Sequence, residues 1–181
     1  MIVPSDADRP TAVRGLELDD AQRARGDHLR QVHDMYRAEL EFLLRVTQQV
    51  EDGVAQITDI RQALHDLSLR RQLEAYGSMC GRFCQLLDTH HRIEDAHIFP
   101  QARTLEDGHY APVVDQLHRE HELVHGLLLA IDAAVVATMD GSGPLGDVLD
   151  RIRELGELLI SHFAYEETEL AEPLALLDMP I

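Results

Sequence analysis

Hydrophobic residues recur along most of the chain in alternating steps of three and four residues, the spacing of one face of an α-helix. Four long segments carry this pattern, over residues 21–51, 69–102, 112–139 and 144–177, and a shorter segment over 57–67 joins the first two. No segment alternates convincingly between apolar and polar residues as a strand does. We therefore predict an all-α protein, an antiparallel up-down-up-down four-helix bundle with a short crossover helix between helices one and two.

Turn-forming residues mark the ends of these segments. Asp52 and Gly53 follow the first, a Gly-Ser-Gly turn at 141–143 follows the third, and Pro144 suits the first position of the fourth. Residues 1–20 show no sustained periodicity. We predict that they form a flexible N-terminal lead-in and that residues 21–177 form one domain.

The composition restricts the partners of this domain. The 181 residues include 33 acidic and 16 basic side chains, a net charge of −17, which opposes binding to nucleic acid or to an anionic membrane surface. We see no signal peptide and no apolar run close to the roughly 20 residues that span a bilayer. The two cysteines are too few for a disulfide framework. We expect a cytoplasmic protein that binds neither nucleic acid nor membranes.

Histidine interrupts the hydrophobic face of all four long segments, and in two of them a glutamate follows four residues later. A single such histidine is usually a hydrogen-bonded core residue, but several at one level are different, because buried ionisable groups are costly unless they are paired or hold a metal. At a rise of about 1.5 Å per residue, these groups lie within about one turn of the same depth. The residues are His33, His90 with Glu94, His121 and His162 with Glu166.

The spacing also suggests the chemistry. Residues four apart share a helix face, so each His-x-x-x-Glu pair can direct two donors to one site, and His121 with His125 can do the same. Nitrogen and carboxylate donors suit iron, manganese or zinc, and two carboxylates among several imidazoles can bridge two ions. The predicted metal ligands are His33, His90, Glu94, His121, His125, His162 and Glu166.

Some neighbouring residues remain as alternatives. His28 is a substitute for His33, and Glu167 is a substitute for Glu166. We expect His91 and Asp95 to support the ligands from outside or to lie at the surface, with direct binding as the less favoured case.

These motifs resemble the hemerythrin-like (HHE cation-binding) family. The resemblance rests on His33, on the segment 90–100 (His-His-Arg-Ile-Glu-Asp-Ala-His-Ile-Phe-Pro), on the pair 120–121 and on the segment 162–167, and it covers about residues 25–177. It implies a bundle around two iron ions with an oxo or hydroxo bridge. By position, Glu94 and Glu166 would be bridges, and His125 would match a second imidazole of the dioxygen-carrying branch. The terminal ligands would be His33, His90, His121 and His162.

The resemblance also implies a small-molecule ligand, namely dioxygen, hydrogen peroxide or nitric oxide. The corresponding roles are oxygen or redox sensing and peroxide detoxification, the latter with catalase-like turnover. The dioxygen carriers have an aspartate five residues after the last histidine, whereas this chain has Glu166 at four and Glu167 at five, which favours roles other than simple storage. The alternative is a cation-binding or protein-interaction bundle without redox turnover. The resemblance leaves a protein partner and homodimerisation open.

Overall fold

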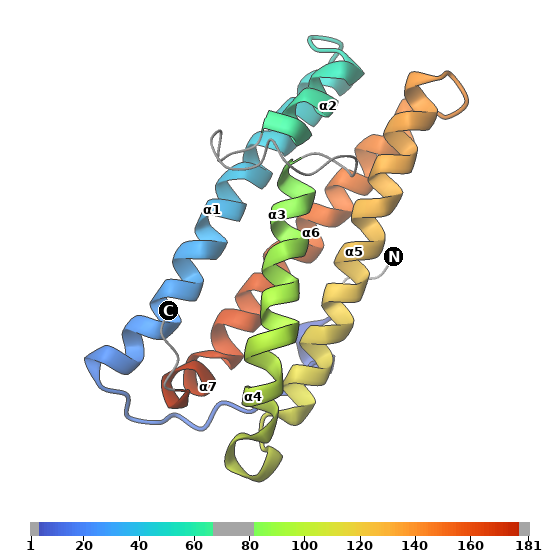
Figure 1. The fold of residues 1–181 in the computed structure, drawn as a ribbon. Helices are drawn as coiled ribbons and strands as arrows, with labels where there is room; N and C mark the ends of the chain where they lie inside the picture. Colours follow the sequence, from blue (N-terminus) through green and yellow to red (C-terminus); the bar gives the residue numbers. More distant parts are fainter. Residues whose placement is uncertain (1–3, 67–81, 178–181) are drawn as a thin grey trace.

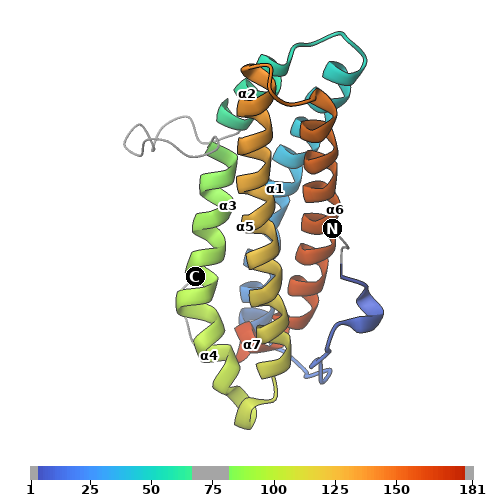
Figure 2. The ribbon, with the colours of Figure 1, turned by 90° about the vertical axis from the view of Figure 1, so that its right-hand side faces the viewer.

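The computed structural model describes residues 4–66 and 82–177, and every regular element within these residues is a helix. The long helices are α1 (Asp20–Glu51), α3 (Arg82–Ile93), α5 (Ala111–Met139) and α6 (Leu145–Glu169). They lie side by side, with α1 and α5 running in one direction and α3 and α6 in the other (Figures 1 and 2). The prediction of an all-α bundle is confirmed.

The shorter elements join or extend these four. They are η1 (Asp6–Asp8), α2 (Ile57–Asp66), η2 (Glu94–Ile98), α4 (Phe99–Thr104), η3 (Leu105–Gly108) and α7 (Ala171–Leu176). α2 occupies the place predicted for the crossover helix. The first part of the predicted second helix, residues 69–81, lies outside the described residues.

Local sequence explains where α1 begins and ends. The Asp19 side chain accepts a hydrogen bond from the Gln22 backbone N–H, and the Gln22 side chain accepts one from the Asp19 N–H, which together form a capping box. After the last turn, Gly53 adopts a φ of 73°, a left-handed conformation that glycine tolerates without strain.

The segment predicted as one helix over residues 144–177 is two helices, α6 and α7, so that prediction is wrong in its continuity. The break follows from Pro173, which lacks an N–H and whose ring would clash with the carbonyl of Glu169, four residues earlier. α6 therefore ends at Glu169, and the Leu170 N–H donates to the Glu166 carbonyl at 2.8 Å.

The break provides carboxylates that hold the N-terminal segment. The Glu169 carboxylate accepts from the Ala12 N–H at 2.7 Å, and the Glu172 carboxylate accepts from the Arg14 N–H at 2.8 Å. Arg9 and Ala12 are 7% and 5% exposed. The expectation of a flexible lead-in over residues 1–20 therefore needs correction, because the described part of it packs against the bundle.

The core consists of two hydrophobic clusters, one in each half of the bundle. The larger includes Leu40, Leu87 and Leu159, and the smaller includes Leu29 and Leu174. On each long helix, the residues between the two clusters carry the ionisable side chains predicted from the sequence. The fold thus isolates a polar layer between two apolar ones.

α5 is the one helix among those described with the length and mean hydropathy, 1.7 over an 18-residue stretch, to cross a membrane. The composition did not predict this property. It is weak support for a membrane span, because core helices of soluble proteins pass the same test. α5 also carries the buried Glu120 and His121, and it packs against α6 along the bundle.

Candidate metal centre

The polar layer brings together seven ionisable side chains from α1, α3, η2, α5 and α6. They are His33, His90, His91, Glu94, His121, His162 and Glu166. All except His90 are at most 5% exposed, and the side chain of His90 is 12% exposed. Such burial is costly for charged or polar groups that have no partner.

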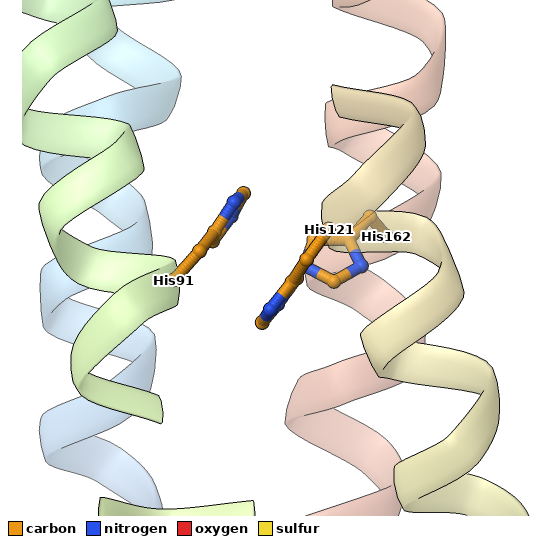
Figure 3. Close-up of side chains that lie close together, drawn as sticks. All are labelled: His91, His121 and His162. Atoms are coloured by element: carbon orange, nitrogen blue, oxygen red, sulfur yellow. The ribbon is translucent and has the colours of Figure 1, made fainter. Parts of the chain in front are cut away.

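The seven side chains form two adjoining groups. Within each group, one possible ligand atom per residue lies within 4.8 Å of the others. The mixed group contains His33, His90, Glu94 and Glu166. The imidazole group contains His91, His121 and His162, which converge from α3, α5 and α6 (Figure 3). We call the two groups together the centre.

Each glutamate of the mixed group also reaches the imidazole group. Glu94 places Oε1 at 3.2 Å from His90 Nε2 and Oε2 at 3.7 Å from His121 Nε2. Glu166 Oε2 lies 3.3 Å from His33 Nε2 and 3.5 Å from His162 Nε2. A carboxylate that faces two sets of imidazoles is placed to bridge two cations.

Three of the imidazoles are oriented by carboxylates outside the centre. His33 Nδ1 donates to Glu167 at 2.9 Å, His121 Nδ1 to Asp95 at 2.9 Å, and His162 Nδ1 to Glu120 at 3.1 Å. When Nδ1 carries the proton, Nε2 presents its lone pair, and in each case Nε2 is the atom near a bridging glutamate. Metal-binding histidines are commonly held in this way.

The donor atoms fit a cation because they lack other partners. Nε2 of the three imidazole-group histidines and both oxygens of Glu94 and Glu166 are buried without a hydrogen bond. Each such atom costs about 1–3 kcal/mol when it is left unsatisfied. His33 Nε2 and His90 Nε2 face each other at 3.2 Å. A cation would satisfy all of these lone pairs at once.

The protonation states point the same way. Burial lowers the pKa of His90 to about 3 and lowers the pKa of His91 and His121 as well, so these imidazoles are neutral near pH 7 and able to bind a metal. Burial, and then the charge of Glu166, raises the pKa of Glu94. Burial also raises the pKa of Glu166, but His33 and His162 outweigh it and lower that pKa to about 2. A cation beside the two glutamates would offset the charge of Glu166 that raises the pKa of Glu94.

A π-helical turn, η2, directly follows α3, which carries His90 and His91, and begins at Glu94, the third member of the centre from this part of the chain. The Phe99 N–H donates to the Glu94 carbonyl, five residues earlier, and Pro100 has no N–H to continue the ordinary pattern. The wider turn begins at Glu94, which faces the centre. Beyond it, the Phe99 ring stacks on His121 with centroids 5.1 Å apart. Pro100 was the signal in the sequence for this irregularity.

The structure brings six of the seven predicted ligands together and leaves out His125. The His125 side chain is 42% exposed, and its Nδ1 lies 3.1 Å from Asp88. His125 lies one turn, about 6 Å, along α5 from His121, where its neighbour is Asp88 of α3, so it faces the surface between α3 and α5. His91, which we expected to lie outside the ligand set, takes a place in the imidazole group instead.

The structure also places the two alternative ligands, His28 and Glu167, outside the centre. His28 is exposed and belongs to neither group. Glu167 accepts the hydrogen bond from His33 Nδ1, so it orients that histidine, whereas Glu166 faces the centre.

Sequence reasoning missed the support of His162. Arg9 Nε and Nη2 donate to the two oxygens of Glu120 at 2.8 Å each, and Arg9 Nη1 donates to Ser161 Oγ at 2.7 Å. Burial raises the pKa of Glu120, but hydrogen bonds from His162, Arg9 and Gln116 outweigh it and lower that pKa to about 2. Glu120 is therefore an ionised carboxylate held between the guanidinium group of Arg9 and the imidazole of His162. No motif in residues 1–20 indicated this contact.

Comparisons with known proteins agree with the centre. The family described as hemerythrin HHE cation binding domain matches residues 25–174, which include all seven members of the centre. No curated protein and no solved structure matches the chain. The match spans most of the chain and confirms the resemblance drawn from its motifs. The chain belongs to the hemerythrin HHE cation-binding family, and its fold holds a His/Glu cation-binding centre.

Proposed function

We propose that this protein is a non-haem di-iron protein that binds or reacts with a small apolar ligand, dioxygen or nitric oxide, in oxygen or redox sensing. Two ions are supported by Glu94 and Glu166, each of which faces both groups of imidazoles. Iron is supported by the mixture of imidazole and carboxylate donors. When bound, an iron pair would supply electrons to the small ligand.

A cavity beside the centre favours an apolar ligand. It has a volume of about 490 Å³, lies between α1 and α3, and reaches His90 and Glu94. Its walls are mainly apolar and include Leu29, Val32 and Ile93. Dioxygen and nitric oxide lose little hydration in such a cavity, whereas hydrogen peroxide would leave its hydrogen bonds with water behind. This cavity is the observation that supports an apolar diatomic ligand.

Tyr36 closes one side of this cavity without offering a proton to the centre. Its hydroxyl donates to the Leu86 carbonyl at 3.0 Å, and its ring stacks on His90 with centroids 5.3 Å apart. Burial, then the charge of Glu94, raises the Tyr36 pKa, so the hydroxyl stays protonated. Tyr36 therefore excludes water from His90 rather than acting as an acid.

We expect Val32→Phe to slow ligand binding while leaving the metal content unchanged, because the larger ring narrows the cavity and Val32 is not a member of the centre. The effect should be on the order of tenfold in rate, equivalent to about 1.4 kcal/mol. The measurement is stopped-flow absorbance of the reduced, iron-loaded protein mixed with dioxygen, nitric oxide or hydrogen peroxide. Val136→Phe, at an exposed valine on α5, is the matched control.

The outcome separates the candidate functions. Spectral change with dioxygen or nitric oxide, slowed in Val32→Phe only, supports the proposal. Rapid turnover of peroxide that Val32→Phe does not slow would instead support catalase-like detoxification. No spectral change with any of the three ligands would leave a bundle that binds cations without redox turnover, and the proposed function would be wrong.

A further inference from the structure

A second cavity reaches the centre from another side, and most of the residues that line it are charged or polar. It has a volume of about 450 Å³ and is lined mainly by residues of α3 and α5, whereas the apolar cavity is lined mainly by residues of α1 and α3. Figure 1 labels these three helices. Its walls include Asp88, Asp95, Glu122 and His125. It ends at two members of the imidazole group, His91 and His121. We call this cavity the α3–α5 pocket.

The pocket repeats at the surface the arrangement that orients histidines in the centre. His125 Nδ1 lies 3.1 Å from Asp88 Oδ1. Just beyond the pocket, His118 Nδ1 lies 3.1 Å from Asp95 Oδ1, the same oxygen that accepts from His121 Nδ1. A carboxylate at Nδ1 makes Nε2 the donor available to a cation, as it does for the buried histidines. His125, left out of the centre, thus has the orientation of a metal-binding residue.

The inner end of the pocket holds a donor atom with no other partner. His91 is 5% exposed, and its Nε2 is buried without a hydrogen bond. Its ring stacks on His121 at a centroid distance of 4.0 Å, so the two rings lie together at the inner end of the pocket. Side chains that can bind a cation therefore follow one another along the pocket, from His125 at the surface, past Asp95, to His91 at the centre.

We propose that the α3–α5 pocket is an uptake port through which a divalent cation reaches the centre. This inference rests on the proposed function, because it assumes that the centre holds metal. A hydrated cation cannot shed its water in the apolar cavity without a large desolvation cost, whereas carboxylates and imidazoles can replace its water ligands one at a time. The two cavities then serve as separate entry routes. Cations enter through the α3–α5 pocket, and apolar ligands enter through the cavity beside α1.

One positive side chain lies at the mouth of the port. Arg92 Nε is 2.7 Å from Asp88 Oδ2, and the Arg92 side chain is 71% exposed. It holds the oxygen of Asp88 that does not face His125. Asp88 Oδ1 and the imidazole thus remain directed to the pocket, and Glu122 and Asp95 add negative charge that attracts a cation.

The test is the rate at which metal-free protein takes up Co²⁺, followed by stopped-flow absorbance of the bound ion, together with the final cobalt content. We expect the double variant Asp88→Asn/His125→Gln to reach the same final content as the wild type but more slowly, on the order of tenfold. Both side chains lie outside the centre, so the final content reports on the centre and the rate reports on the port.

Two control variants make the test specific. Asp147→Asn removes one carboxylate from a different pocket, between α5 and α6, whose lining contains no member of the centre, and it should load at the wild-type rate. Val32→Phe narrows the apolar cavity and should also load at the wild-type rate. Uptake by the double variant at the wild-type rate would overturn the port, and so would slow uptake by Val32→Phe.

These outcomes are distinct from a failure of the proposed function. If the wild-type protein bound no cobalt, the centre would not hold metal, and both the proposed function and the proposed uptake port would be wrong. If all variants bound cobalt fully and at the same rate, the metal centre would be supported and only the proposed uptake port would be wrong.

Discussion

Glu166→Gln is expected to abolish binding of both ions, whereas Glu167→Gln is expected to retain them at an affinity about 10- to 100-fold lower. Glu166 Oε2 faces His33 and His162 at 3.3 and 3.5 Å, so its loss removes a donor from both groups. Glu167 contacts His33 through Nδ1, on the side away from the other donors. Its loss frees the orientation of one imidazole and removes no donor from the centre.

Iron titration of the two metal-free variants, followed by desalting and elemental analysis, measures both effects. The pair is well matched because the residues are adjacent and the substitution is the same. Circular dichroism of each metal-free variant establishes that the helices have formed. Full metal binding by Glu166→Gln, together with its loss in Glu167→Gln, would exchange the two roles and contradict the assignment of Glu166 to the centre.

Arg9→Gln is expected to lower the free energy of unfolding by about 3–5 kcal/mol, the usual effect of removing one partner from a buried ion pair. The side chains of Arg9 and Glu120 are 1% and 0% exposed, and Gln cannot reproduce the two-point contact with both oxygens. Because Glu120 also accepts from His162 Nδ1, metal affinity should fall as well. The N-terminal segment thus supports the centre from outside the family match at residues 25–174.

The control for this variant is Arg14→Gln in the same segment. The Arg14 side chain is 40% exposed, and it pairs with Glu106 at the surface, so its replacement should leave stability and metal affinity essentially unchanged. Urea unfolding with and without bound metal measures stability, and titration measures affinity. Equal stability of Arg9→Gln and wild type would show that the N-terminal segment is not part of the support of the centre.

Periodicity predicted the helices well where ordinary helical geometry holds. The extents of α1 and α5 follow from their apolar faces and from the turn residues beyond them. Periodicity does not predict the helix where one proline changes the backbone. Pro173 divides the predicted last helix into α6 and α7, and Pro100 follows the π-helical turn η2. Both prolines were visible in the sequence, but their effect depends on which carbonyl they face, and periodicity does not include that.

Periodicity also misplaced one residue of the centre: it predicted His125, whereas the structure places His91 there. His125 satisfied the same four-residue spacing as the two His-x-x-x-Glu pairs, but the turn of α5 that carries it lies beside Asp88 of α3 rather than beside the centre. His91 lies one residue beyond the predicted ligand His90, yet its ring packs against the centre's histidines from α5 and α6. Arg9 could not be predicted, because its contact with Glu120 joins residues 111 positions apart.

Elemental analysis of protein purified from iron-replete cells and desalted tests the central claim most directly, namely that the His/Glu layer is a dinuclear iron centre. A dinuclear centre should carry about two irons per chain, as in other bundles whose facing helices supply carboxylates and histidines. The same preparation of Glu166→Gln serves as the background for loosely bound metal. One tightly bound zinc per chain, or no metal above that background, would contradict it.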